Sequence, residues 1–277
     1  MHLGPYAGAT YALITHWAVG IALTVAVADT EVGLIRDHPL YGRRLSGRVV
    51  PPLATTGLLS PFLLNGHLHS LPPRWVLVSM ALMLPFAWLS WRWAKTWVGW
   101  SPALRRRRLG VWAVGAGLAA VALSNLLALR DLQPAWRMVI PMSIFAGTVA
   151  LPGALTNLSL MALTAGLPAE VPGGPARGVA EVGGFGVLVN LLALGDAGLA
   201  WLQSGGSWPA PAGAFLLAWA AGALAIPGSI LLARLWWRTM PDAIFMPAAL
   251  VSAVVGQWFG LALIFRFPGL VPPIRWS

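Results

Sequence analysis

The sequence contains no cysteine and very little charge. Of its 277 residues only 9% are charged, eight are acidic, and 58% are hydrophobic. Without cysteine, the chain itself cannot hold a thiolate-ligated iron–sulfur cluster, form a disulfide or use a thiol as a nucleophile. The longest polar stretch, Asp29 to Arg48, is too short for a water-soluble domain, so any catalysis in water would belong to a partner chain.

Long apolar blocks make up most of the chain, and short connectors rich in Gly, Pro and Arg separate them. A helix needs about 20 apolar residues to cross about 30 Å of hydrocarbon, and a backbone in lipid must satisfy its own hydrogen bonds. We therefore predict an all-α integral membrane protein, with residues 1–277 as one polytopic domain in contact with the lipid bilayer. The predicted transmembrane helices are residues 8–28, 49–67, 74–94, 109–129, 138–165, 180–202, 211–233 and 243–265.

The second of these eight helices has the weakest pattern, because prolines interrupt it. We expect residues 1–130 and 131–277 to form two four-helix bundles, with a ligand site in the first.

The positions of the basic residues predict the orientation of the helices. Connectors on the cytoplasmic side of membrane proteins carry an excess of Lys and Arg. Thirteen basic residues follow the odd-numbered spans, including the run Arg105 to Arg108, whereas five lie at the opposite side. Both termini are therefore predicted to be non-cytoplasmic. Because this topology accounts for the net charge of +10, we expect no nucleic-acid partner.

A small set of polar residues is predicted to share a pocket near the outer surface of the first half. Polar groups at membrane depth cost free energy, so each is a functional candidate. His16 lies about halfway along the first span, and Asn125 lies in the last turns of the fourth. A quinone ring needs hydrogen-bonding partners for its two oxygens, a proton carrier active near neutral pH, and access from lipid, and His can carry the proton. The other candidates for this quinone pocket are His69, Arg74 and Trp136.

Other interpretations of these residues stay open. A single intramembrane His or Asn also serves as an interhelical hydrogen-bond partner. Two histidines on different helices could hold a b-type haem. However, His67 and His69 point about 200° apart around a helix, and both lie nearer the surface than His16. We therefore do not expect a haem, and no spacing indicates a metal site.

Three acidic residues are candidates for a proton path through the second half and the cytoplasmic end of the first span. They are Asp196, Glu181 and Asp29. The alternative is that the first two are acids buried in a neutral, hydrogen-bonded state.

The segment around the fourth and fifth spans resembles a known family of membrane proteins. Leu126 to Leu155 reads LLALRDLQPAWRMVIPMSIFAGTVALPGAL, and it is similar to a segment of the NrfD, polysulfide reductase and DMSO reductase type of membrane anchor subunit. The residues that carry this similarity are Pro134, Trp136, Pro141, Phe145 and Gly153.

Three further segments resemble the same family more loosely. His67 to Trp75 is similar to a motif that follows the family's second helix. Trp219 to Ile230 is similar to a helix with a Gly-Leu-x-x-Pro core, and Val251 to Arg266 is similar to the final helix.

This resemblance implies a non-catalytic or quinol-oxidising subunit of an oxidoreductase in a bacterial or archaeal cytoplasmic membrane. Such a subunit binds menaquinone or ubiquinone without a haem and exchanges electrons with a docked iron–sulfur subunit, beyond which lies a molybdenum-type catalytic subunit. The family's first-helix His corresponds to His16, and Asn125 is nearest to its fourth-helix polar residue. We expect Arg130 and Arg137 to contribute to docking of the partner.

The chain departs from the family pattern at three places. His69 stands where the family has Gly, Leu13 replaces an expected Asn, and a fourth-helix Tyr is absent. Two other functions therefore stay open, namely a transporter or channel-like bundle without a redox role and a single-haem cytochrome b subunit.

Overall fold

The computed structural model describes residues 5–30, 43–64, 74–97, 102–131, 139–164, 175–237 and 245–267, and nearly all of them are helical. The prediction of an all-α protein is confirmed. In chain order the elements are α1 (Pro5–Thr30), the π-helical η1 (Arg43–Val49) leading into α4 (Val50–Leu64), α5 (Arg74–Thr96), α6 (Ala103–Asp131), α7 (Val139–Thr164), α8 (Pro175–Gln203), α9 (Ala210–Ala220), the π-helical η2 (Ala221–Ala225), α10 (Ile226–Trp237) and α11 (Phe245–Arg266).

Seven helical segments in the described residues are long and apolar enough to cross a membrane. They are Tyr6–Asp29, Trp75–Thr96, Ala103–Arg130, Ile140–Leu163, Arg177–Gln203, Ala210–Leu231 and Phe245–Arg266. These agree with seven of the eight predicted spans. The remaining one corresponds to α4, which has 15 residues with Pro61 inside it and follows the basic η1.

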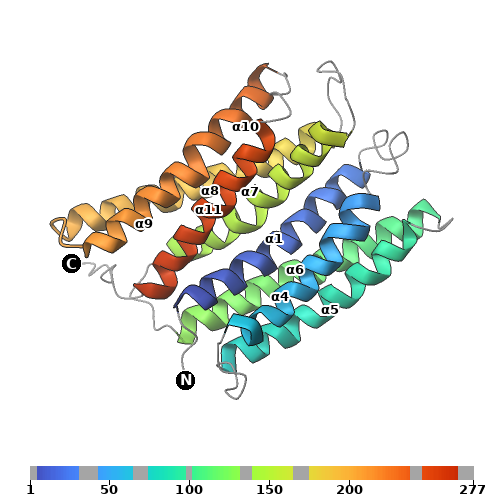
Figure 1. Cartoon of the computed structure of the whole chain (residues 1–277), viewed down its shortest axis with the longest axis horizontal. Helices are drawn as coiled ribbons and strands as arrows, with labels where there is room; N and C mark the ends of the chain where they lie inside the picture. Colours follow the sequence, from blue (N-terminus) through green and yellow to red (C-terminus); the bar gives the residue numbers. More distant parts are fainter. Residues whose placement is uncertain are drawn as a thin grey trace.

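The helices form two neighbouring groups, and α1 and α7 lie along the boundary between them (Figure 1). In the first group α4 and α6 pack against α1, and α5 packs against α6. In the second group α8 and α11 pack against α7, and the α9–η2–α10 rod packs against α8 and α11. Contact between the groups is made chiefly by α1, which packs on α7, α11 and α8, whereas α6 has little contact with α7. The cavity described below lies along this boundary.

The crossing of α1 and α7 depends on two glycines. Gly20 and Gly153 face each other so closely that a Cβ on Gly153 would overlap the backbone of Gly20, and a Cβ on Gly20 would overlap the carbonyl group of Val149. Two hydrogen bonds cross the same contact. Thr24 Oγ1 donates to the carbonyl oxygen of Gly153 at 3.3 Å, and Trp17 Nε1 donates to Thr156 Oγ1 at 2.8 Å. Small residues with interhelical hydrogen bonds are what drive helix association in lipid.

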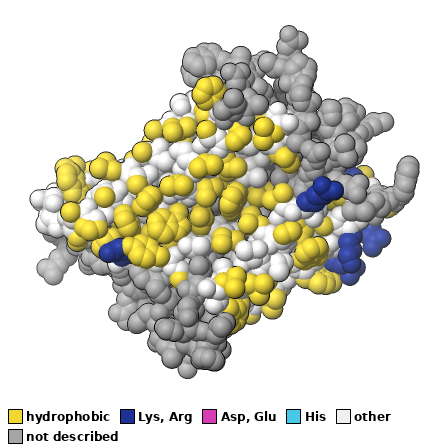
Figure 2. All heavy atoms as spheres, in the orientation of Figure 1, with side chains coloured by type: hydrophobic (Ala, Val, Ile, Leu, Met, Phe, Trp, Pro, Cys, Tyr) yellow, Lys and Arg dark blue, Asp and Glu magenta, His cyan; other side chains and the backbone are white. Residues whose placement is uncertain are grey.

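The outer surface of the bundle is apolar along its length and basic at its ends. Figure 2 shows hydrophobic side chains across the visible face, with Lys and Arg side chains gathered at the ends of the helices. Exposed Leu, Val, Phe and Trp side chains come from α5, α6 and α8, among others. Basic residues at one end stack on indole rings, with Arg92 Cζ 5.1 Å from the Trp88 ring and Arg106 Cζ 4.4 Å from the Trp97 ring. This distribution suits a protein that contacts a lipid bilayer around its middle.

We predict that Gly20→Ala destabilises the folded chain, because even one methyl group must push α1 away from α7. Overpacking of this kind costs about 1–3 kcal/mol. The measurement is the unfolding midpoint of the purified protein in detergent. Gly115→Ala is the matched control, because a Cβ at Gly115 on α6 meets nothing within 4 Å. Equal midpoints for the two variants would contradict the role assigned to this crossing.

Candidate functional site

His16 of α1 and Asn125 of α6, two of the residues predicted for the pocket, lie in direct contact in the first group of helices. The His16 Nε2 atom is 3.1 Å from Asn125 Oδ1. The other ring nitrogen, Nδ1, hydrogen bonds to the carbonyl oxygen of Ala12 one turn earlier in α1. Both side chains are buried, with 2% exposure for His16 and 4% for Asn125. The contacts thus use both nitrogens of the imidazole.

Aromatic and hydroxyl side chains fill the space around the His16 ring. The ring stacks face to face on Phe145 of α7, with 5.5 Å between the centroids. A void of only about 10 Å³ adjoins the ring, and Tyr11, Ser79 and Ser124 are among the residues that line it. The Tyr11 and Ser79 hydroxyls are hydrogen bonded at 2.5 Å. The imidazole is therefore closely packed, and it does not line the large cavity that lies beside it.

A large cavity lies next to this pair, on the far side of Asn125 and Phe145. Its volume is about 660 Å³, and α1, α6, α7 and α8 line it. Phe185 and Leu118 at its walls are exposed, so the cavity opens onto the apolar outer surface of the bundle. Its lining residues are Leu23, Val27, Leu118, Val121, Ala122, Asn125, Met142, Phe145, Ala146, Val149, Ala150, Gly178, Glu181, Val182 and Phe185.

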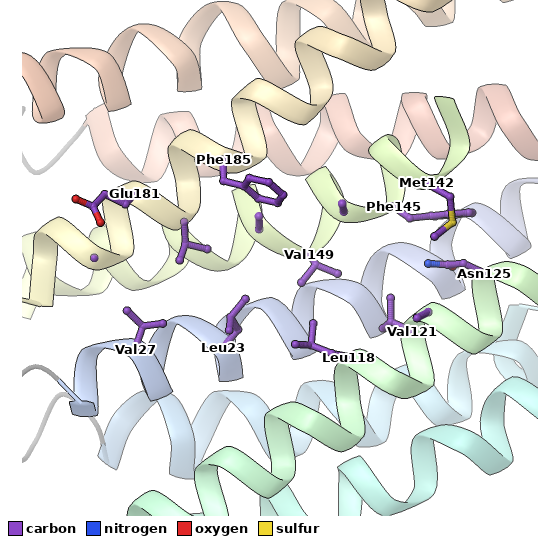
Figure 3. Close-up of a pocket in the computed structure, with 15 residues that line it drawn as sticks. Leu23, Val27, Leu118, Val121, Asn125, Met142, Phe145, Val149, Glu181 and Phe185 are labelled. Carbon is purple, nitrogen blue, oxygen red and sulfur yellow. The ribbon is translucent and has the colours of Figure 1, made fainter. Parts of the chain in front are cut away.

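The cavity is apolar along its walls and has one polar side chain near each end. Figure 3 shows Asn125 beside Met142 and Phe145 at one end, and Glu181 near Val27 at the other. Asn125 lies near the end of α6 and Glu181 near the start of α8. In the predicted orientation the Asn125 end is therefore the outer one. An elongated apolar molecule with one polar head would match this distribution of groups.

Small side chains create the space, and sequence reasoning missed it. Ala122, Ala146, Ala150 and Gly178 lie on three different helices and all line the cavity. Alanine and glycine are frequent throughout the transmembrane segments, so their sequence positions alone do not mark a cavity. Only the arrangement of α6 and α8 on either side of α1 and α7 brings these particular residues together.

The three predicted proton-path residues have different surroundings in the structure. Glu181 is exposed at the mouth of the cavity rather than buried as expected, and its Oε1 accepts a hydrogen bond from Arg177 Nε at 2.8 Å. Asp196 is half-buried in α8 and does not line the cavity. Asp29 lies at the end of α1 in contact with α6.

Asp29 forms a two-point ion pair with Arg106 that ties the ends of α1 and α6 together. The guanidinium donates from Nη2 to Oδ1 at 2.8 Å and from Nε to Oδ2 at 3.2 Å. The carboxylate is 3% exposed, and the Trp97 ring covers the guanidinium. With both oxygens accepting bonds from Arg106, Asp29 serves here as a structural contact between helices.

The remaining candidates lie away from the pair or outside the described residues. Arg130 is exposed at the end of α6. Arg74 is the first residue of α5, and its side chain is not among those described. His69, Trp136 and Arg137 lie outside the described residues. The structure therefore shows where His16 and Asn125 lie, and the shared pocket itself stays a prediction.

Comparison with known proteins leaves the family assignment as a resemblance. No family model, curated protein or solved structure matches this chain. Within the described residues, no group of three or more His, Cys, Asp or Glu side chains could hold a metal ion.

We predict that Asp29→Asn destabilises the bundle, because it leaves the half-buried Arg106 without its counter-charge. Breaking a buried ion pair costs about 3–5 kcal/mol, and the partial exposure of Arg106 favours the lower end of that range. Unfolding in a graded denaturing detergent measures the loss. Arg105→Gln removes a neighbouring exposed charge and serves as the control. A loss for Arg105→Gln as large as that for Asp29→Asn would point to general loss of charge at this end instead.

Proposed function

We propose that this chain is the quinone-binding membrane subunit of a respiratory oxidoreductase in a bacterial or archaeal cytoplasmic membrane. In this role it exchanges electrons between menaquinone or ubiquinone in the bilayer and an iron–sulfur partner subunit, with a molybdenum-type catalytic subunit beyond. One observation carries the proposal: a cavity of about 660 Å³, open to the apolar surface, ends at an amide that is hydrogen bonded to a buried histidine.

The cavity fits such a ligand in size and chemistry. Its volume lies within the range of about 300–1,000 Å³ that is usual for small-molecule sites. The walls of Leu, Val, Ala and Phe suit an isoprenoid tail, and the wall open to lipid gives a route of entry. Asn125 is the residue that would hydrogen bond to an oxygen of the ring, and Phe145 and Met142 would pack against the ring faces. His16 does not line the cavity and would influence the quinone only through its contact with Asn125.

The contacts of His16 favour this function over a b-type cytochrome. A haem iron binds an imidazole nitrogen that has a free lone pair. Both nitrogens of His16 are in contact with oxygen atoms, one of the Ala12 backbone and one of Asn125. The ring would have to leave both partners and its stack on Phe145 to bind iron.

We further propose that the seven apolar spans of the described residues and the rod formed by η1 and α4 all cross the membrane, and that both termini lie outside the cytoplasm. The start of α1 lies beside the end of α11, since Tyr6 stacks on Trp258 at 5.6 Å and Arg266 Cζ lies 5.2 Å from the Tyr6 ring. A chain whose first helix starts on the side where its last described helix ends must cross the membrane an even number of times. The seven apolar spans are an odd number, so the rod formed by η1 and α4 supplies the eighth crossing.

The outer end of the bundle is then the place for partner docking. Arg130 is exposed at the end of α6, about one and a half turns beyond Asn125. Arg137, outside the described residues, follows it in the connector to α7. A partner bound there would bring its nearest cluster to the Asn125 end of the cavity.

We predict that the purified chain in lipid nanodiscs binds decylubiquinone, and that Ala122→Trp abolishes this binding by filling the cavity. The matched control is Ala119→Trp, which places the same ring on an exposed position of α6 that does not line the cavity. Binding of a radiolabelled probe measures both. Undiminished binding by the Ala122→Trp variant would remove the cavity from the proposed function.

We also predict that Asn125→Leu weakens this binding by about tenfold, the value of one hydrogen bond of about 1.4 kcal/mol. Gln203→Leu removes an exposed amide outside the cavity and should leave the affinity unchanged. An equal affinity for the Asn125→Leu variant would mean that the amide does not contact the ring.

The orientation has a direct test, because the chain has no cysteine of its own. We expect a membrane-impermeant maleimide to label Gln203→Cys in intact cells and to label Ala103→Cys only after permeabilisation. These positions lie at opposite ends of the bundle, at the end of α8 and the start of α6. The reverse pattern would invert the proposed orientation.

A further inference from the structure

The two neighbours of the His16 ring impose a condition on its protons. Nδ1 faces the carbonyl oxygen of Ala12, which can only accept a hydrogen bond, so Nδ1 must carry a proton. A neutral imidazole has a single N–H, and Nε2 of a neutral His16 is then an acceptor. The atom of Asn125 that faces Nε2 is Oδ1, at 3.1 Å, and this atom is also an acceptor. In this orientation of the amide, both contacts are hydrogen bonds only when His16 is an imidazolium.

A second arrangement satisfies the same contacts when His16 is neutral. The Asn125 amide turns by 180°, so that Nδ2 donates to the unprotonated Nε2 of His16. His16 is the hydrogen-bond partner that the structure gives the Asn125 side chain among the described residues, so no second partner there holds the amide in one orientation. The pair therefore has two satisfied states, which differ by one proton and one rotation of the amide.

The two states present opposite groups to the cavity. With His16 as an imidazolium, Oδ1 is turned to the ring and the NH₂ group faces the cavity, as Figure 3 shows for the nitrogen of Asn125. With neutral His16 the amide oxygen faces the cavity instead. The first state offers a hydrogen-bond donor to a ligand, and the second offers an acceptor.

We propose that His16 is a positioning residue that sets, through the Asn125 amide, whether the cavity wall donates or accepts a hydrogen bond. This inference rests on the proposed function and deepens it. An oxidised quinone presents a carbonyl oxygen and binds the imidazolium state, whereas a quinol presents a hydroxyl and binds the neutral state as a donor. Binding of the oxidised form is then coupled to uptake of one proton by His16, and the reduced form binds without it.

No other described group near the ring can supply this coupling. On α1 the Tyr11 hydroxyl is hydrogen bonded to Ser79 of α5, and the residues of α6, α7 and α11 that face the ring are Ser124, Asn125, Phe145 and Phe265, which do not titrate. The charged side chains closest to this region are exposed or paired with other residues. Arg130 is exposed at the end of α6, and the exposed Arg266 lies over the ring of Tyr6. Glu181 is at the opposite end of the cavity, paired with Arg177.

The direct test is nitrogen NMR of the full chain in nanodiscs, with ¹⁵N-labelled histidine and either decylubiquinone or decylubiquinol as the probe. The His16 resonances are assigned by their loss in His16→Gln. At one pH within the titration range of His16, we expect a larger imidazolium fraction with the oxidised probe and a larger neutral, Nδ1-protonated fraction with the reduced probe. The same protonation state with both bound probes would overturn the inference.

The second test is the pH dependence of binding. The affinity for decylubiquinone relative to decylubiquinol should rise as the pH falls, by up to about tenfold per pH unit through the titration of His16, because the oxidised form binds with one more proton. In His16→Gln this ratio should be independent of pH, since glutamine does not titrate. In Glu181→Gln the pH dependence should persist.

The outcomes separate this inference from the proposed function. If neither probe binds, the quinone site itself is wrong. If both probes bind and the ratio of their affinities in the unmodified chain does not change with pH, the quinone site is supported and the proposed role of His16 is wrong. If His16→Gln keeps the full pH dependence, another group carries the proton and the inference is again overturned.

Discussion

The contact between α1 and α7 at Gly20 and Gly153 is the constraint on which the rest of the structure depends. In lipid there is little hydrophobic gain from packing helices together, so close van der Waals contact and interhelical hydrogen bonds must hold them. Here each helix has a glycine at the crossing, and Thr24 adds a hydrogen bond across it. With α1 and α7 this close, α6 and α8 lie on either side of them. The cavity occupies the space between α6 and α8, and Leu23 and Val149 line it directly beside the crossing.

The same contact explains why an amide, and not the imidazole, faces the cavity. His16 lies one turn before Gly20 on α1, and the close approach of α7 places the Phe145 ring flat against it. The imidazole is thereby separated from the cavity and can act there only through Asn125. A buried pair joined by a hydrogen bond in this way restricts both side chains to a few arrangements. In the proposed function, the hydrogen-bonding character of the site depends on a proton held one side chain away from the ligand.

Much of the helical layout followed from hydropathy, because every backbone group in lipid must be satisfied within a helix. Seven of the predicted spans match helices of the required length, and the one that does not, α4, is the segment in which prolines and a preceding basic stretch weaken the pattern. The contact between His16 and Asn125 agrees with the tendency of the few polar residues at membrane depth to hydrogen bond to each other. By contrast, Glu181 was expected to be buried, although it is exposed and paired with Arg177. Hydropathy identifies a helix but does not determine which of its faces meets lipid.

The sequence by itself therefore determined that this is a helical membrane protein, how its helices follow one another, and which polar side chains are candidates for function. The tertiary structure alone decided that Asn125 reaches the cavity while His16 does not, that Asp29 is bound to Arg106, and that alanines from separate helices leave open space between them. The physical reason is that span length and composition are local properties of the chain. A cavity arises from the rotation and separation of four helices, which depend on where their glycines allow close contact.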